Sequence, residues 1–257
     1  METGRPVEGP RVAALYDIHG NLPALEAVLA EIHEEGVDEV VVGGDVLPGP
    51  MPAECLAALA ALDLPVRYLR GNGEADVLAT RSGDVPARVP ERVRSLLEWT
   101  VDAVPDAALD RVASWPGTVP GRIVGLGSVL FCHATPRDDN ELFTRETPEA
   151  RLRPVVEAPG TDVVVCGHTH MAFDRVVGAV RVVNAGSVGL PFGTTGAFWA
   201  ALGPDVSLRR TTYDLDAAMR RFEDAGYPGL ADFDVRRPPD ERAMLDRFEA
   251  AALGAIP

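Results

Sequence analysis

Short apolar runs, polar loops and helical patterns alternate along the first third of the chain. Each apolar run has the length of a strand and ends at a polar loop that contains glycine. We expect strands at residues 11–16, 37–42 and 66–69, and helices at residues 22–35 and 52–62. Strand, loop and helix units in succession predict a parallel sheet that is covered by helices.

The pattern changes after residue 82. Residues 82–119 are more polar, and helical periodicity at residues 91–101 and 107–115 predicts a small helical cap. Seven short β-like runs follow, most of them separated by turns that contain glycine, and we expect them to form a second sheet. These runs are residues 122–124, 128–132, 162–166, 173–177, 180–183, 197–202 and 206–212.

The end of the chain is helical in pattern. Helices are expected at residues 215–225 and 239–253, with a turn around residues 227–229 between them. No internal repeat and no long linker divides the sequence. We therefore expect one domain of residues 1–257, with a core at 11–213 and a C-terminal helical tail at 214–257.

The composition is that of a folded globular protein. Hydrophobic residues make up 46% of the 257 residues and charged residues 25%, while the 25 glycines and 22 prolines are dispersed, which excludes a collagen-like chain. The apolar stretches fall far short of the roughly 18 residues of a membrane helix, and the first ten residues have no signal-peptide pattern. We expect a cytoplasmic protein without a membrane partner. The three cysteines have no recognisable spacing, so neither a disulfide framework nor a cysteine-type zinc site is expected.

The charge balance restricts the partners. The chain has 24 basic residues, all of them arginine, against 39 acidic ones, and its net charge is −15. A protein that follows the backbone of long nucleic acid normally carries a basic stripe, and this sequence has no such run. Any phosphate-bearing substrate is therefore expected to be small, or to be held by local positive charge. The sequence leaves the oligomeric state open, a homo-oligomer included.

Polar residues with metal-binding chemistry follow the predicted strands. In open α/β sheets the loops at the carboxyl ends of parallel strands meet at one crevice, so we expect these side chains to lie close together. A pair spaced i, i+2 in an extended segment points to the same side, as a chelating pair requires. The candidates are Asp17, His19, Asp45, Asn72, His133, His168 and His170.

Each of these elements has a plainer interpretation when taken alone. An isolated Asp-x-His or His-x-His is more often a surface loop or a satisfied polar pair than a metal site, and their joint occurrence at strand ends favours the site. The fifth histidine, His33, lies in a predicted helix between Glu31 and Glu34, and a solvated helix face accounts for it.

The donor types select the metal. Four imidazoles, two carboxylates and an amide suit Mn, Fe, Zn or Ni better than Mg or Ca, which prefer oxygen ligands. Seven ligands are too many for one catalytic ion that keeps an open position, so we expect two divalent transition-metal ions that share a carboxylate, with Mn favoured.

The ordered motifs of this chain resemble those of the calcineurin-like metallophosphoesterases, in particular the small bacterial phosphoesterases of that superfamily. The resemblance covers residues 11–213. It rests on residues 17–21 (Asp-Ile-His-Gly-Asn), 44–45 (Gly-Asp), 71–74 (Gly-Asn-Gly-Glu), 133–136 (His-Ala-Thr-Pro), 167–170 (Gly-His-Thr-His) and 183–187 (Val-Asn-Ala-Gly-Ser).

This resemblance implies an α/β fold in which two β-sheets form a sandwich flanked by helices, in agreement with the two sheets expected above. It also implies that one metal is held by Asp17, His19 and His170. The other would be held by Asn72, His133 and His168, and Asp45 would bridge the two. A metal-bridging hydroxide would then attack the phosphorus of a small phosphodiester or phosphomonoester.

One position departs from the family pattern. Many members have Gly-Asn-His-Asp, in which the histidine assists as general acid, whereas this chain has Gly73 and Glu74. We expect activated diesters to be favoured over monoesters, and we expect a histidine restored at Gly73 to help poor leaving groups. Glu74 is expected to orient a ligand histidine.

Two other functions fit the sequence less well. A degenerate member of the family that serves as a protein-binding module has no need of seven metal donors, and its metal content would distinguish it. A metal-dependent amidohydrolase would have His-x-His near the first strand and a late aspartate, which is the reverse of the order found here.

Overall fold

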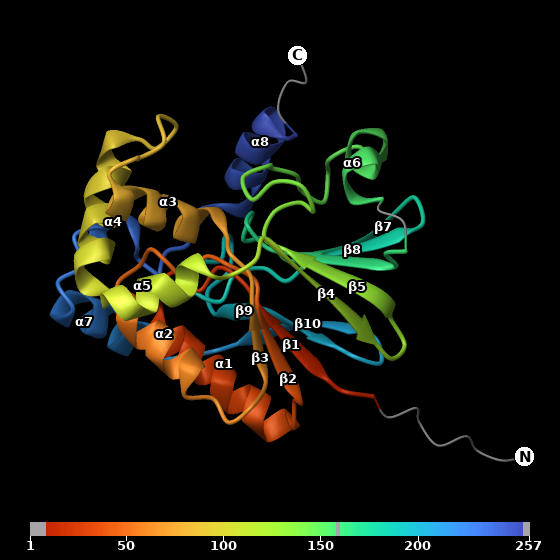
Figure 1. Ribbon diagram of the computed structural model, residues 1–257, viewed down its shortest axis with the longest axis horizontal. Coiled ribbons are helices and arrows are strands. Elements are labelled where there is room, and N and C mark those ends of the chain that lie inside the picture. The colour runs from red at the N-terminus through yellow and green to blue at the C-terminus, as the bar shows by residue number, and fades with distance from the viewer. Residues whose placement is uncertain (1–8, 158–159, 254–257) are drawn as a thin grey trace, which may run out of the picture.

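The computed structural model describes residues 9–157 and 160–253, and in it the chain forms two five-stranded sheets with helices around them (Figure 1). The first sheet has the order β10-β9-β1-β2-β3, and β1, β2 and β3 run parallel. Its strands are β1 (Val12–Leu15), β2 (Glu39–Val42), β3 (Val66–Tyr68), β9 (Ala197–Leu202) and β10 (Val206–Thr211).

The two last strands return to the first sheet, so the expectation that all later strands form the second sheet is wrong for them. β9 pairs antiparallel with β1, Ala13 lying opposite Ala201, and β10 pairs with β9. β1 is buried along its whole length, and β9 satisfies the backbone groups on the edge of β1 that β2 leaves open.

The second sheet is mixed and has the order β4-β5-β6-β8-β7. β5, β6 and β8 are parallel, and β4 and β7 pair antiparallel at the two edges. Its strands are β4 (Thr118–Ile123), β5 (Gly127–Cys132), β6 (Val163–Cys166), β7 (Phe173–Val177) and β8 (Val180–Asn184).

The sheets pack face to face, and helices cover their outer faces. Along β1 and the residue that follows it, Val12, Ala14 and Tyr16 pack against the second sheet. Ala13 and Leu15 pack against helices, as the alternation of side chains in a strand requires. The hydroxyl of Tyr16 donates to the carbonyl oxygen of Val165 at 2.9 Å and so joins the two sheets. This arrangement confirms the predicted fold class.

Helices α1 to α5 and α7 gather on one side of the molecule, and α6 and α8 lie on another (Figure 1). Residues of α4 and α5 continue the apolar core beneath the first sheet, where Leu97 and Leu109 are buried. The helices are α1 (Leu22–Glu35), α2 (Pro52–Ala60), α3 (Asn72–Ser82), α4 (Glu91–Ala103), α5 (Asp106–Ala113), α6 (Glu149–Val156), α7 (Leu215–Asp224) and α8 (Glu241–Ala251), with a short 3₁₀ helix at Leu230–Asp232.

The sequence pattern predicted α1 with its observed bounds and missed α6. Gly36, in the left-handed conformation, ends α1, and the Asn21 side chain caps its start. α6 has eight residues and contains Pro154, so its helical pattern is short and interrupted. No helix within the described residues is long and apolar enough to cross a membrane.

Candidate metal centre

All seven candidate residues lie at one edge of the molecule, where strands of both sheets end. Asp17 and His19 follow β1, Asp45 follows β2, and Asn72 is the first residue of α3. His133 follows β5, and the pair His168 and His170 follows β6. The loops are joined across the sheets, because the backbone N–H of His168 donates to Oδ2 of Asp17 at 2.8 Å.

Several of these residues have a backbone conformation that side chains other than glycine rarely adopt. Among the described residues, six that are not glycine have a positive φ, and five of the six are candidates. Their φ values lie between 46° for His19 and 65° for His168. Such strained residues cluster at functional sites, where surrounding contacts hold them in place. The expectation of an extended Asp-x-His pair is therefore wrong, because both residues of that pair turn through the left-handed region.

The first group of donors consists of Asp17, His19 and His170. Oδ1 of Asp17 lies 3.4 Å from Nε2 of His170, and the Nε2 atoms of His19 and His170 are 3.1 Å apart. The Nδ1 atoms of these histidines face backbone carbonyl oxygens, that of Pro48 at 3.3 Å and that of Leu190 at 2.7 Å. Because a carbonyl oxygen can only accept, Nδ1 of each ring carries a proton, and Nε2 of the neutral ring presents a lone pair.

The second group surrounds His133. Its Nε2 lies 3.1 Å from Oδ1 of Asn72 and 3.5 Å from Oδ1 of Asp45, and its Nδ1 lies 2.9 Å from the carbonyl oxygen of Gly43. The ring centre of His168 is 5.1 Å from that of His133. His168 and His170 thus lie in different groups, which is the grouping that the family resemblance implies.

Asp45 lies between the two groups. Its Oδ2 is 3.7 Å from Nε2 of His19, in the first group, whereas its Oδ1 is 3.5 Å from Nε2 of His133, in the second. Two sets of three potential ligands, which share Asp17, have their ligand atoms within 4.8 Å of one another: Asp17 with His19 and His170, and Asp17 with Asp45 and His133.

The donor set fits cations. Oδ1 of Asp17 is buried and has no hydrogen-bond partner among the described residues. When the rings are neutral, the lone pairs of His19 and His170 point at each other, and that of His133 points at carboxylate and amide oxygens. Acceptors that face one another in a buried place repel unless a positive charge lies between them. Nitrogen and oxygen donors together suit divalent transition metals.

Burial and mutual charge shift the pKa values of these groups strongly. Burial, aided by His170, lowers the pKa of His19 to about 3, and burial with His133 beside it lowers that of His168 to about 3. Both imidazoles are therefore neutral and free to bind a metal. Burial, together with the nearby carboxylates of Glu74 and Asp17, raises the pKa of Asp45 to about 8. A carboxylate in such surroundings needs a cation to stay ionised at neutral pH.

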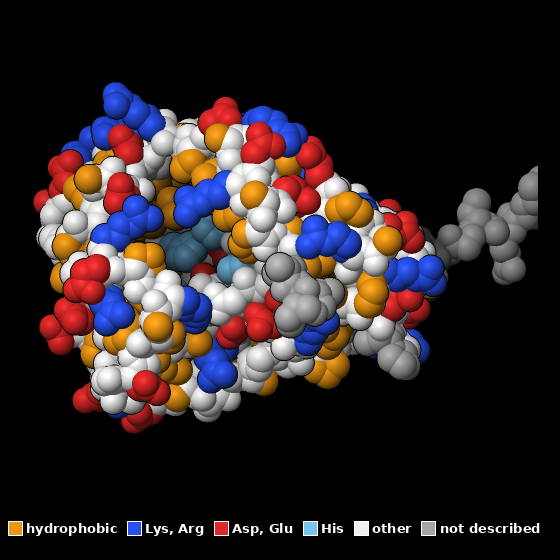
Figure 2. All heavy atoms as spheres, turned by 90° about the horizontal axis from the view of Figure 1, so that it is seen from above, with side chains coloured by type: hydrophobic (Ala, Val, Ile, Leu, Met, Phe, Trp, Pro, Cys, Tyr) orange, Lys and Arg blue, Asp and Glu red, His pale blue; other side chains and the backbone are white. Residues whose placement is uncertain are grey.

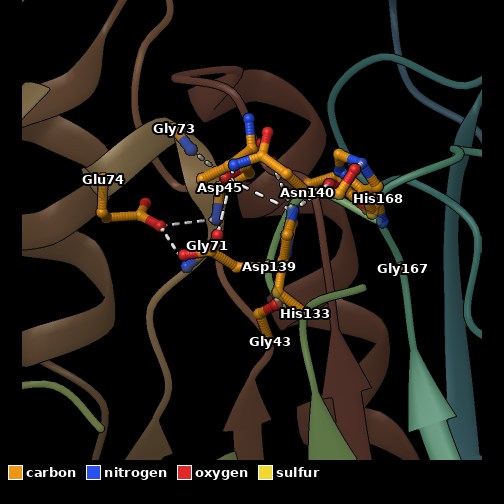
Figure 3. A network of polar contacts seen from close by, with 12 residues as sticks. Gly43, Asp45, Gly71, Gly73, Glu74, His133, Asp139, Asn140, Gly167 and His168 are labelled. Atoms are coloured by element: carbon orange, nitrogen blue, oxygen red, sulfur yellow. Dashed lines mark hydrogen bonds and ion pairs between the residues drawn. The ribbon is translucent and has the colours of Figure 1, made fainter. Parts of the chain in front are cut away.

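Glu74 joins the loops of the site from one side (Figure 3). Its buried carboxylate accepts three backbone hydrogen bonds, from Asp45 at 2.8 Å, Gly71 at 2.9 Å and Leu47 at 2.9 Å. The prediction that Glu74 orients a ligand histidine is wrong in its partner, because the carboxylate holds backbone amides. It positions the loop of Asp45 against the start of the helix that carries Asn72.

No side chain fits at Gly73. A Cβ atom there would lie 2.1 Å from the carbonyl oxygen of Leu47 and 2.8 Å from Oδ1 of Asp45. The backbone N–H of Gly73 donates to that same Oδ1 at 2.7 Å. The expectation that a histidine restored at this position would assist catalysis is therefore wrong for this backbone.

Three contacts of the site were not predicted from the sequence. The Asn184 side chain donates to the carbonyl oxygen of Gly167 at 2.6 Å and so holds the turn that carries the two histidines. The Phe192 ring stacks on His170, with ring centres 5.1 Å apart. The carbonyl oxygen of Asn140 lies 3.3 Å from Nε2 of His168, so Nε2 carries the proton and Nδ1 of that neutral ring presents the lone pair. Of these three residues, only Asn184 lies in a motif that the sequence shows, residues 183–187, and no pattern in the sequence indicates Phe192 or Asn140.

The site opens to the surface through a hollow in which histidine side chains are visible (Figure 2). Arginine side chains stand around its rim, although the chain as a whole is strongly acidic. His33 has no part in the site, because it is exposed on α1. Local positive charge at the mouth favours an anionic ligand.

Comparisons with known proteins agree with this arrangement. The family model of the calcineurin-like phosphoesterase superfamily domain matches residues 11–202. Phosphodiesterase YfcE of Escherichia coli K12 is 29% identical over 196 residues, which are 74% of this chain and 85% of that protein. An uncharacterised protein of Methanocaldococcus jannaschii is 29% identical over 163 residues, and the match spans 63% of its length.

Solved structures show the same fold. A metallophosphoesterase from Sphaerobacter thermophilus superposes with a TM-score of 0.67 at 24% identity and covers 88% of this chain and 98% of its own. A hypothetical protein from Pyrococcus horikoshii OT3 has a TM-score of 0.70 at 20% identity, over 86% of this chain and 95% of its own. The motifs, the two-sheet fold and the matching family model confirm the predicted resemblance: the chain belongs to the calcineurin-like phosphoesterase superfamily.

Proposed function

We propose that this chain is a metal-dependent phosphoesterase that hydrolyses small phosphate esters and prefers activated phosphodiesters. The observation that carries the proposal is the buried cluster of lone pairs in which Oδ1 of Asp17 has no partner within the described residues. A phosphodiesterase that is 29% identical over most of its length supports the same chemistry.

The two groups of donors suggest how metals would be held. Asp17, His19 and His170 would bind one divalent ion, and Asn72, His133 and His168 a second, with Asp45 shared. Mn is the favoured ion, and Fe, Zn or Ni also suits these donors. When bound, such ions lower the pKa of water and offset the negative charge of the phosphoryl oxygens in the transition state.

The chain's own residues orient the histidine rings and determine which ring nitrogen carries the proton. Backbone carbonyl oxygens fix the tautomers of His19, His133 and His170, so that each presents Nε2 to the centre of the site. The arginines at the rim give a small anionic substrate a favourable approach. The net charge of −15 disfavours a long polyanion.

Exhaustive chelation is expected to abolish turnover, and added Mn is expected to restore it. The midpoint of thermal unfolding should also rise with Mn, because an ion that binds only the folded state at 100 times its Kd stabilises that state by about 2.7 kcal/mol. Turnover that persists after verified metal removal would contradict the proposal. A purified chain that binds no metal and has no turnover would instead favour the protein-binding alternative.

The leaving group should have a strong effect on rate. Gly73 offers no proton donor, so esters whose leaving groups depart without protonation are expected to react fastest. We expect kcat/KM for an aryl diester to be at least that of the matching monoester, and to fall steeply along a series of diesters of increasing phenol pKa. A flat series would show that another group donates the proton, and a strong preference for alkyl monoesters would overturn the substrate preference.

A further inference from the structure

A second cavity lies between α2, β3 and α5, and its lining includes none of the seven candidate metal ligands. Its volume is about 330 Å³, within the range of roughly 300 to 1,000 Å³ that is typical of small-molecule sites. The walls are largely apolar and include Leu59, Val66 and Val112.

Two aromatic side chains, those of Tyr68 and Trp115, line the cavity. The rings of Tyr68 and Trp115 stack with centres 4.7 Å apart and an angle of 17° between their planes. Tyr68 belongs to the edge strand of the first sheet, and Trp115 follows α5. Stacked rings at a concave apolar surface favour a flat, apolar ligand group.

Arg111 supplies charge at the same cavity. Its guanidinium forms no ion pair or hydrogen bond with any residue within 9–157 and 160–253, and it lines this cavity and a neighbouring hollow. The acids Asp106 and Asp110 of the same helix pair with Arg81 instead. An unpaired arginine beside apolar walls is complementary to a carboxylate, which it can bind through two parallel hydrogen bonds.

We propose that this cavity binds a small aromatic carboxylate, with its ring against the apolar walls and its carboxylate on Arg111. Tyr68, which lines the same cavity, also carries a polar hydroxyl group. This inference is independent of the proposed phosphoesterase activity.

Trp115 fluorescence tests the proposal on the full chain with 3-phenylpropionate as the probe. We expect saturable quenching by the carboxylate and about tenfold weaker binding of 3-phenylpropanamide, which has the same shape without the charge. Arg111→Gln should weaken the carboxylate about tenfold and leave the amide unchanged. Arg220→Gln, at an exposed arginine that forms no ion pair among the described residues, is the matched control.

Two further variants make the outcome specific. Trp115→Phe should remove the signal but keep binding measured by calorimetry. Ala60→Glu, at an exposed position of the lining, should exclude the carboxylate by charge repulsion while circular dichroism stays unchanged.

Each alternative result would overturn the proposal. Equal binding of 3-phenylpropionate and 3-phenylpropanamide would show that Arg111 does not bind the carboxylate. Absence of binding at millimolar concentration would show that the cavity is not a site for this class of ligand. If sedimentation shows a dimer that Ala60→Glu dissociates, a second copy of the chain covers the cavity instead.

Discussion

Replacement of Asp45 by asparagine is expected to lower kcat/KM about 10³-fold and to weaken metal binding at both positions. The two carboxylate oxygens face opposite groups, Oδ2 towards His19 at 3.7 Å and Oδ1 towards His133 at 3.5 Å. Asparagine keeps the shape but loses the negative charge and presents an amide nitrogen to one of the groups. Loss of about 4 kcal/mol of charge stabilisation corresponds to a 10³-fold change in rate.

Metal content per chain and activity, measured on the same preparation, check this prediction. His33→Ala is the control, because that histidine is exposed on α1, and it should change neither quantity. Full occupancy and full activity in the Asp45→Asn protein would refute the shared ligand. Loss of metal in the His33→Ala protein would show that His33 takes part in metal binding.

Replacement of Glu74 by glutamine is expected to weaken metal binding about 10- to 100-fold, the usual effect of losing a group that orients metal ligands. The carboxylate accepts from Asp45 and Gly71 through one oxygen and from Leu47 through the other. Glutamine places an N–H group against at least one of these donors. Each buried polar group that is left unpaired costs about 1 to 3 kcal/mol, so the free energy of unfolding should fall as well.

A second buried acid of α3 separates the two effects. The buried carboxylate of Asp76 pairs with Arg88 at 2.7 Å. Unlike Glu74, it forms no hydrogen bond with the loops of Asp45 and Gly71 among the described residues. Asp76→Asn should lower the free energy of unfolding and leave metal affinity, measured by calorimetry, unchanged. If Glu74→Gln and Asp76→Asn change metal affinity equally, Glu74 stabilises the fold and has no specific role in positioning the metal ligands. Glu74→Asp, one methylene shorter, should restore the charge but only part of the affinity.

Local patterns in the sequence determined most of the individual elements. The helical spacing of apolar residues predicted α1 with its bounds, and the strands β7 and β9 were predicted to the residue. The candidate donors were found because they follow strand ends, and loops at strand ends meet in sheets of this kind. The ordered motifs were enough to predict the family.

Tertiary structure alone decided which partners these elements take. Nothing local in Ala197–Leu202 shows that this strand lies beside β1, because a buried strand has the same pattern in either sheet. The separation of His168 from His170 depends on left-handed backbone conformations, which the spacing i, i+2 does not encode. The space at Gly73 is filled by the carbonyl oxygen of Leu47, from a loop 26 residues away in sequence.

The physical reason is the range of the interactions involved. Hydrophobic periodicity reports which face of a helix or strand is buried, and that depends on near neighbours in the chain. Other interactions arise between segments that meet only after folding. They include strand pairing, the hydrogen bonds of Glu74 to two loops and the close approach of Leu47 to Gly73. The sequence by itself thus determined most of the elements, the family and the candidate donors, and the tertiary structure decided which sheet each strand joins and what holds the candidate donors in place.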